Sequence, residues 1–210
     1  MNKLGDLSCN EFLTELASAA PAPGGGGGAA MAGALAAALA SMVANLTIGK
    51  EKFAECEPEV KELLKQAEAE RVRLLTLVDE DAAVFNSFMS CYKLPKTTDE
   101  EKAARTAAIR AAAKQAATVP LNIARSSFAV LKLADRLVVA GNPGVITDGA
   151  CSGLLARAAL RCAEYNVRIN LGLTKDEVWN AQAAADLKQL LADAEALETR
   201  LLAVTDKALQ

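Results

Sequence analysis

The chain contains no histidine and few aromatic residues. Its 210 residues include one tryptophan, two tyrosines and five phenylalanines. Without histidine, neither a Ser-His nor a Cys-His catalytic pair can form. No two of the five cysteines have the spacing of zinc ligands, so a structural zinc site is not expected. The five cysteines are odd in number and scattered along the chain: Cys9, Cys56, Cys91, Cys151 and Cys162. This pattern favours reduced thiols in a cytoplasmic protein.

The charge pattern and the apolar segments exclude further classes of protein. The net charge is -3 and no basic cluster stands out, so nucleic acid is not expected as a partner. Residues 1–13 lack the apolar core of a signal peptide. Residues 29–48 are long enough to span a bilayer, but they are mostly alanine and contain Ser41, Asn45 and Thr47. We therefore expect a buried bundle helix there and no membrane partner.

Helix signals dominate the chain. Hydrophobic residues make up 52% of it, chiefly alanine and leucine, which favours closely packed helices over strands. Capping boxes at residues 8–11, 98–101 and 174–177 each predict a helix start. We expect helices over about 8–19, 29–47, 58–92, 98–120, 121–140, 147–171 and from 174 onward, with Pro120 kinking or ending its helix. The prediction is one all-α domain over residues 1–210, a bundle of long antiparallel helices.

A run of five glycines, residues 24–28, precedes the small-residue helix. Ordering glycine costs backbone entropy and adds no side chain to pack. Bare N–H groups at a helix start, together with the positive end of the helix dipole, would favour an anion. The alternatives are a flexible hinge or close helix contact, because the spacing is neither a Walker loop nor a dinucleotide fingerprint. Pro21 and Pro23 stiffen the approach, which slightly favours a shaped loop.

Asp81 is predicted to lie within an apolar stripe of the long helix. It shares helical spacing with Leu74, Leu77, Val84 and Phe88. Asp79 lies off this stripe and is expected to reach solvent. An unpaired buried charge is costly, so Asp81 should be protonated, placed for chemistry, or held in a structural ion pair by a neighbouring lysine or arginine.

The turn before residue 149 and the helix after it carry further polar candidates. Asp148 or Thr147 is expected to cap the helix that follows the turn. Asn142, in the same turn, is also explained by its tolerance of unusual backbone angles. Asn166 and Asn170 lie four residues apart and share a helical face. Their amides need either backbone partners or a polar ligand.

Several segments occur together in an order typical of one family. They are "PAPGGGGG" with the helix after it, "DEDAAVF", "LPKTTDEEKAAR", "VPL", "GNPGVITD" and "NVRIN". As a set, over residues 11–170, they resemble the cyclodeaminase domain of formimidoyltransferase-cyclodeaminases and, more closely, the free-standing methenyltetrahydrofolate cyclohydrolases. The resemblance implies an all-helical homodimer that acts on the one-carbon unit of tetrahydrofolate in one-carbon metabolism.

The resemblance also points to particular residues. It implies roles for Pro23, Gly24, Gly25, Gly26, Lys50, Asp81, Lys96, Asn142, Asp148 and Asn166. Asn142, Asn166 and Asn45 are candidates for reading the polar edge of the pterin. Lys50 and Lys52, or the glycine-led helix start, are candidates for the anionic glutamate tail. By themselves, Lys50, Lys52 and Lys96 are ordinary exposed lysines in breaks between helices.

The reaction that this resemblance implies is hydrolysis of 5,10-methenyltetrahydrofolate to 10-formyltetrahydrofolate. The amidinium carbon is already electrophilic, so no metal, cofactor or covalent nucleophile is needed. We expect Asp148 to act as base or cation stabiliser, with Asp81 as the second candidate. Lys50 or Lys96 would donate to the leaving nitrogen or orient water. The alternatives are a formimidoyltetrahydrofolate cyclodeaminase and, from another class, a non-catalytic scaffold that dimerises through its alanine-rich helix.

Overall fold

Six α-helices and three short 3-10 helices make up the fold. The structure is a computed structural model that describes residues 3–210, and no strand occurs within that range. The α-helices are α1 (Cys9–Ala17), α2 (Gly24–Asn45), α3 (Glu57–Cys91), α4 (Asp99–Ala140), α5 (Ile146–Thr174) and α6 (Glu177–Ala208). The 3-10 helices are η1 (Leu4–Asp6), η2 (Glu51–Phe53) and η3 (Pro143–Val145). The all-α bundle predicted from the sequence is confirmed.

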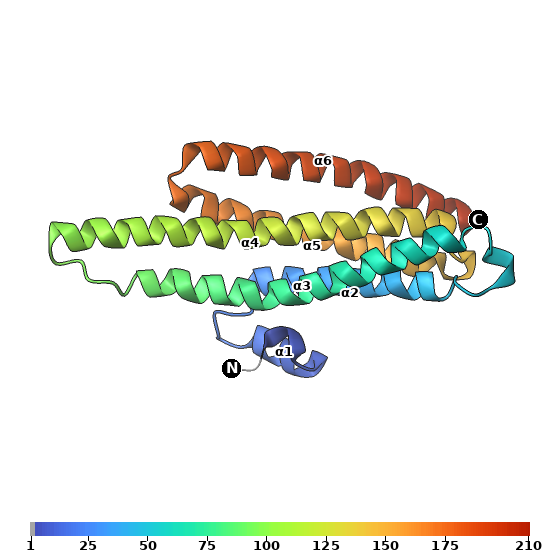
Figure 1. Ribbon diagram of the computed structural model, residues 1–210, viewed down its shortest axis with the longest axis horizontal. Coiled ribbons are helices and arrows are strands. Elements are labelled where there is room, and N and C mark those ends of the chain that lie inside the picture. Colours follow the sequence, from blue (N-terminus) through green and yellow to red (C-terminus); the bar gives the residue numbers. More distant parts are fainter. Residues whose placement is uncertain (1–2) are drawn as a thin grey trace.

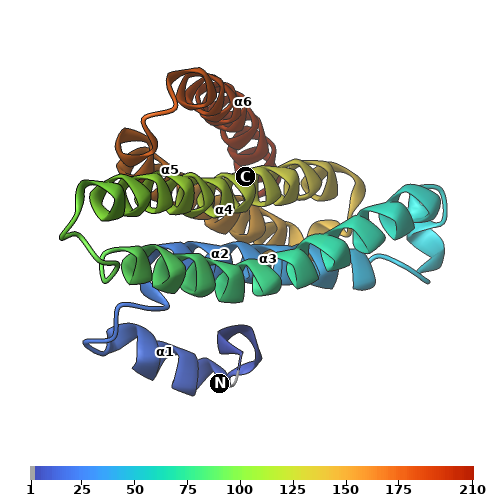
Figure 2. The same ribbon diagram turned by 60° about the vertical axis from the view of Figure 1, so that its left-hand side comes forward.

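Two layers of long helices form the body of the molecule. In Figure 1, α3 and α4 pass in front of α2 and α5. Helix α6 covers the edge formed by α4 and α5, and α1 lies at the opposite edge, beside α3 and α2. The turned view in Figure 2 shows the same separation of α1 from α6. The outer side of α2 and α5 is covered by no other helix of the described chain.

Small side chains make α2 the central helix. Ala30, Ala36 and Ala37 have no exposed surface, and a Cβ added at Gly33 would lie only 3.0 Å from the Ser127 hydroxyl. Alanine and glycine let neighbouring backbones approach, so apolar area is buried without large side chains. By length and composition α2 could cross a membrane, but 61% of its most apolar window is buried inside the protein.

The helix starts follow the sequence in two of three cases. Capping boxes at Ser8 and Thr98 are confirmed, each with its glutamate reaching back to the cap. The third is wrong, because Thr174 is the last residue of α5 and Asp176 caps α6 by accepting the Trp179 N–H at 3.0 Å. The Thr174 hydroxyl instead accepts the N–H of Asp176 at 3.2 Å. Thr174, which the sequence pattern predicts as the cap of the next helix, thus stabilises the turn between α5 and α6 instead.

The helix containing Pro120 does not end there. Helix α4 runs without interruption over 42 residues, so the alternative in which Pro120 ends its helix and a second one follows is wrong. Proline removes one N–H from the helical ladder and leaves the carbonyl four residues earlier, that of Ala116, without its donor. The side-chain amide of Asn170, on α5, donates to this carbonyl at 3.0 Å. A neighbouring helix therefore replaces the hydrogen bond that proline cannot make.

Candidate active site

The glycine run is the first part of α2. Residues 24–28 are helical, so the hinge and the shaped loop are both wrong, and the run is a bare helix start. Gly24 has a φ of 57°, a conformation that favours glycine. Pro23 precedes it as the N-cap residue and is buried. Without side chains, this end of α2 admits other groups directly against its backbone.

The Asp81 carboxylate occupies the space that a side chain at residue 26 would need. A Cβ added to Gly26 would lie 2.6 Å from the Asp81 Cγ, well inside contact distance. Burial raises the pKa of Asp81 to about 6, and the N–H of Gly27 lowers it by a smaller amount. None of the ion pairs within residues 3–210 includes Asp81, so the structural ion pair that the sequence left open is not formed.

Asn166 joins this group from α5. Its amide nitrogen lies 3.5 Å from a Cβ position at Gly25 and donates to the carbonyl of Cys162 at 2.9 Å. Three helices thus meet at one place: α2 with its bare backbone, α3 with a carboxylate, and α5 with an amide. We call this group the glycine-end site, formed by Gly24, Gly25, Gly26, Asp81 and Asn166.

Asn142 lies at the other end of α2, and its hydrogen-bonding groups are already occupied. Its N–H donates to the Thr47 hydroxyl at 2.9 Å, and its amide nitrogen donates to the carbonyl of Leu46 at 3.1 Å. Its amide oxygen accepts the N–H of Gly144 at 3.0 Å and caps η3. Asn142 therefore links α2 to the start of α5, which the residue type alone does not reveal. Asn45, the last residue of α2, is exposed.

Asp148 lies in the first turn of α5, close to this end. The cap predicted at Asp148 or Thr147 is wrong, because α5 begins at Ile146 and its N-cap, Val145, makes no side-chain cap bond. Asn142 caps the preceding η3, which leads directly into α5. The carboxylate of Asp148 is therefore not used as a cap and sits where the helix dipole favours negative charge.

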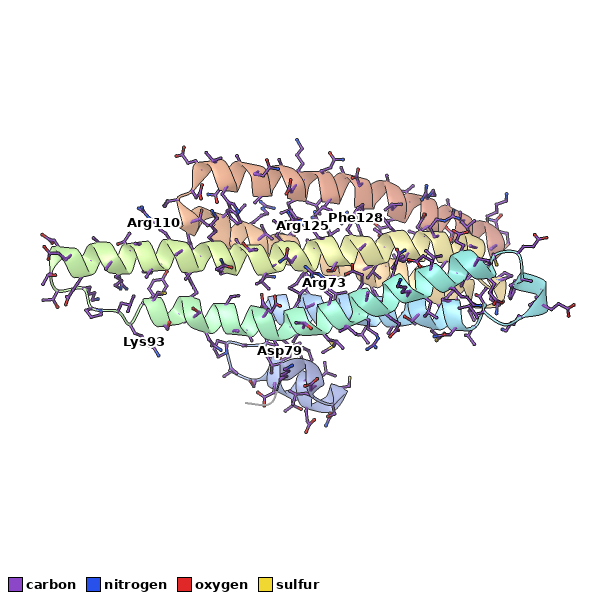
Figure 3. All side chains as sticks on the ribbon, viewed as in Figure 1. Arg73, Asp79, Lys93, Arg110, Arg125 and Phe128 are labelled. Atoms are coloured by element: carbon purple, nitrogen blue, oxygen red, sulfur yellow. The ribbon has the colours of Figure 1, made fainter. Side chains whose placement is uncertain are left out.

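The three lysines are exposed and lie outside the glycine-end site, two of them shortly after the end of α2. Lys50 and Lys52 flank the start of η2, and the Lys52 ammonium lies 4.6 Å above the Phe53 ring. Lys96 lies in the loop between α3 and α4, close in the chain to Lys93, which Figure 3 shows beside the end of α3. The residues predicted for one site are thus brought together only in part.

Asp79 is the carboxylate whose role the sequence does not reveal. The sequence predicts that Asp79 reaches solvent. In the structure its Oδ1 also accepts two backbone hydrogen bonds, from the N–H of Leu4 at 2.6 Å and from that of Gly5 at 3.4 Å. Figure 3 shows Asp79 on the side of α3 that faces the N-terminal segment. No local pattern marks a contact between residues 75 positions apart. Asp79 thus fastens the chain that leads towards α2.

The acidic and thiol side chains are dispersed. Within residues 3–210, no set of three or more histidine, cysteine, aspartate or glutamate side chains is arranged to hold a metal ion. All five cysteines are free.

The described chain is thus an all-α bundle in which a half-buried carboxylate lies against bare helix backbone. The chain belongs to the formiminotransferase-cyclodeaminase family, whose model matches residues 8–189. It is 44% identical to a methenyltetrahydrofolate cyclohydrolase of Methylorubrum extorquens, over 94% of this chain and 95% of that protein.

Two further comparisons extend the likeness to longer proteins and to a solved structure. The formimidoyltransferase-cyclodeaminase of Sus scrofa is 33% identical over 87% of this chain, which spans only 34% of that longer protein. The crystal structure of a formiminotetrahydrofolate cyclodeaminase from Thermotoga maritima matches with a TM-score of 0.88 and 29% identity, over 98% of both chains. The family predicted from the sequence motifs is confirmed.

Proposed function

We propose that the protein hydrolyses 5,10-methenyltetrahydrofolate to 10-formyltetrahydrofolate. The observation that carries this proposal is the near full-length likeness, at 44% identity, to a methenyltetrahydrofolate cyclohydrolase. The half-buried Asp81, with a pKa near 6, supports it chemically, because a base works best when its pKa lies near the working pH. The substrate is a folate, and the reaction needs no permanently bound cofactor.

Asp81 is suited to take the proton from the attacking water. The water oxygen bonds to the carbon between N5 and N10, and its proton passes to the carboxylate. The C–N5 bond of the adduct then breaks: N5 receives a proton, and the adduct hydroxyl loses its proton and becomes the C=O of the formyl group, which stays on N10. One proton is released overall. At neutral pH a carboxyl group with a pKa near 6 is mostly ionised and ready to accept that proton.

Asp148 is suited to a different task. Its position in the first turn of α5 favours a lasting negative charge, which would stabilise the amidinium cation. The sequence favours Asp148 as the base, and the burial of Asp81 assigns that role to Asp81 in this proposal. Lys50 or Lys96 would donate to the leaving nitrogen or orient water, and both are exposed and able to reach a ligand.

A second copy of the chain would bring Asp81, at the start of α2, close to Asp148, near the end of α2. The two ends of α2, with its 22 residues, lie roughly 30 Å apart, since an α-helix rises about 1.5 Å per residue. Large apolar residues are exposed on α2, directly after it and on α5: Leu35, Met42, Leu46, Leu154, Tyr165 and Ile169. The outer side of these two helices is covered by no other helix of the described chain. A homodimer formed on this side, with its two-fold axis near the middle of α2, would pair opposite ends of the two α2 helices.

In such a dimer the glycine-end site of one chain faces Lys50, Asn142 and Asp148 of the other. Mixing two variants tests this arrangement. Chains with Asp81→Asn and chains with Asp148→Asn are each expected to be inactive, and co-expression should restore about one quarter of the wild-type activity by pairing. No recovery, in a preparation shown to contain heterodimers, would place both carboxylates of each site in one chain.

The remaining assignments concern substrate recognition, the cellular compartment and the partners. Asn166 and Asn45 present amides that suit the polar edge of a pterin, while Asn142 supports the wall because its own groups are occupied. Lys50 and Lys52, or the bare start of α2, suit the anionic glutamate tail. Free cysteines fit a cytoplasmic enzyme, with neither nucleic acid nor a membrane as partner.

The decisive assay follows the ultraviolet band of 5,10-methenyltetrahydrofolate in the presence of the purified protein. We expect catalysed loss of the band above the slow uncatalysed rate. The likeness to the Thermotoga maritima cyclodeaminase supports the alternative activity, but at 29% identity it is weaker than the 44% likeness to the cyclohydrolase. This alternative predicts the reverse observation, in which 5-formimidoyltetrahydrofolate yields the band and releases ammonia. A folded protein that does neither would support the scaffold alternative.

A further inference from the structure

Pro120 and Asn170 both affect one backbone carbonyl of α4, that of Ala116, and the proposed chemistry gives neither of them a role. Because Pro120 has no N–H, the carbonyl of Ala116 loses its helical donor. The Asn170 amide nitrogen donates to that carbonyl at 3.0 Å. Pro120 and Ala116 are buried and Asn170 is half-buried, so this hydrogen bond is shielded from water. The pair ties the two helices at a fixed register.

The same amide also reaches the turn of α5 that carries Asn166. Asn170 Nδ2 donates a second hydrogen bond to the backbone carbonyl of Asn166 at 2.8 Å. The side chain of Asn166 then lies beside Gly25, with 3.5 Å between its amide nitrogen and the Cβ position there. One continuous set of contacts thus leads from the carbonyl that Pro120 leaves free to the glycine-end site.

We propose that Asn170 is a positioning residue for the folate site. Anchored on the Ala116 carbonyl, it holds the turn of α5 that presents Asn166 to the start of α2. This inference rests on the proposed function for its substrate. It also accounts for Pro120, because a residue with an N–H at position 120 would give the Ala116 carbonyl its own helical donor and so weaken the anchor.

The first test replaces Asn170 with alanine. A small displacement of a binding group is costly, so we expect the KM for 5,10-methenyltetrahydrofolate to rise roughly tenfold while kcat changes less. Asn122→Ala, which removes an amide from α4 two residues after Pro120, is the matched control and should leave KM unchanged. An unchanged KM in folded Asn170→Ala would overturn the proposal.

The second test separates positioning from stability. In the double variant with Pro120→Ala and Asn170→Ala, the new N–H at residue 120 completes the helical bond to Ala116. The thermal midpoint should therefore return towards that of the wild type. A KM that stays high while the midpoint recovers supports positioning, and a KM that recovers with it makes Asn170 structural only.

A third variant asks whether Asn170 acts through Asn166. Replacing both asparagines with alanine should give the KM of Asn166→Ala alone, and additive effects would contradict the proposal. Calorimetric binding of 5-formyltetrahydrofolate distinguishes the two failures. Binding without turnover refutes the proposed reaction but leaves positioning measurable as Kd, whereas no folate binding by the wild type refutes both.

Discussion

The polar groups at the two ends of α2 differ in how far their charge or hydrogen-bonding capacity is matched by partners within the chain. At the start, Asp81 is pressed against bare backbone and none of the ion pairs among the described residues includes it. At the end, Asn142 places its N–H, its amide nitrogen and its amide oxygen in hydrogen bonds within the chain. The first arrangement costs free energy because a charge loses hydration, and the second stabilises the fold. A charged residue is thus a better candidate for chemistry when the fold buries it without an ion-pair partner.

Removing the Asp81 charge gives the largest expected effect. Asp81→Asn keeps the shape of the side chain but cannot accept the proton of water, so kcat should fall by about 10² to 10⁴. The measurement is the initial rate of loss of the methenyl band, with circular dichroism to show that the fold is retained. A variant with full activity would remove Asp81 from the mechanism.

Adding one methyl group at the glycine end is expected to act next most strongly. Gly26→Ala would place a Cβ within 2.6 Å of the Asp81 Cγ, which forces the carboxylate or α3 to move. We expect kcat/KM to fall by roughly tenfold or more, because misplaced catalytic groups lose their geometry. Gly172→Ala is the control, since nothing lies within 4 Å of its Cβ position. Equal activity of the two variants would contradict the tight contact.

The buried carboxyl of Asp81 should also make stability depend on pH. Its pKa rises from 3.8 to about 6 on folding, so the folded state binds the proton more tightly. The resulting stabilisation is present below pH 3.8 and is lost as the pH rises to about 6. At pH 7, Asp81→Asn should therefore be more stable than the wild type by about 2 kcal/mol, after allowance for solvent screening.

Urea unfolding at pH 4 and pH 7 measures this difference. The gain from Asp81→Asn should be clear at pH 7 and much smaller at pH 4. Glu195→Gln, on an exposed position of α6, is the control and should show no such change. A gain of equal size at both pH values would mean that burial of the charge is not its cause.

The smallest effect is expected at the other end of α2. Asn142→Ala removes the cap of η3 and the bond to the Leu46 carbonyl, and should lower the free energy of unfolding by about 1 to 2 kcal/mol. Asn142→Ala should therefore lower the free energy of unfolding and change kcat little, whereas Asp81→Asn should lower kcat and not the stability. Thermal unfolding and the methenyl assay together check this contrast. A large loss of kcat with unchanged stability would show that Asn142 acts on the substrate.

Local patterns in the sequence determined most of the helices. The capping boxes at Ser8 and Thr98 begin helices as predicted, because cap and backbone N–H lie within three residues. Helical spacing likewise places Asp81 among apolar residues, and α3 ends within one residue of the prediction, at Cys91. The treatment of residues 1–210 as one domain stays a prediction, as do the roles of the individual site residues.

Only the tertiary structure decided which polar groups are used. Asn170 donates to the Ala116 carbonyl, which Pro120 leaves without its helical donor, from 54 residues away. Asp79 accepts the N–H of Leu4 from 75 residues away. Neither contact has a local signal, because hydrogen-bond partners distant in sequence are chosen by packing. The sequence named Asp81 and Asp148 as the acidic candidates. Packing set one against the glycine backbone of α2 and left the other in the first turn of α5, and this difference in surroundings separates their proposed roles.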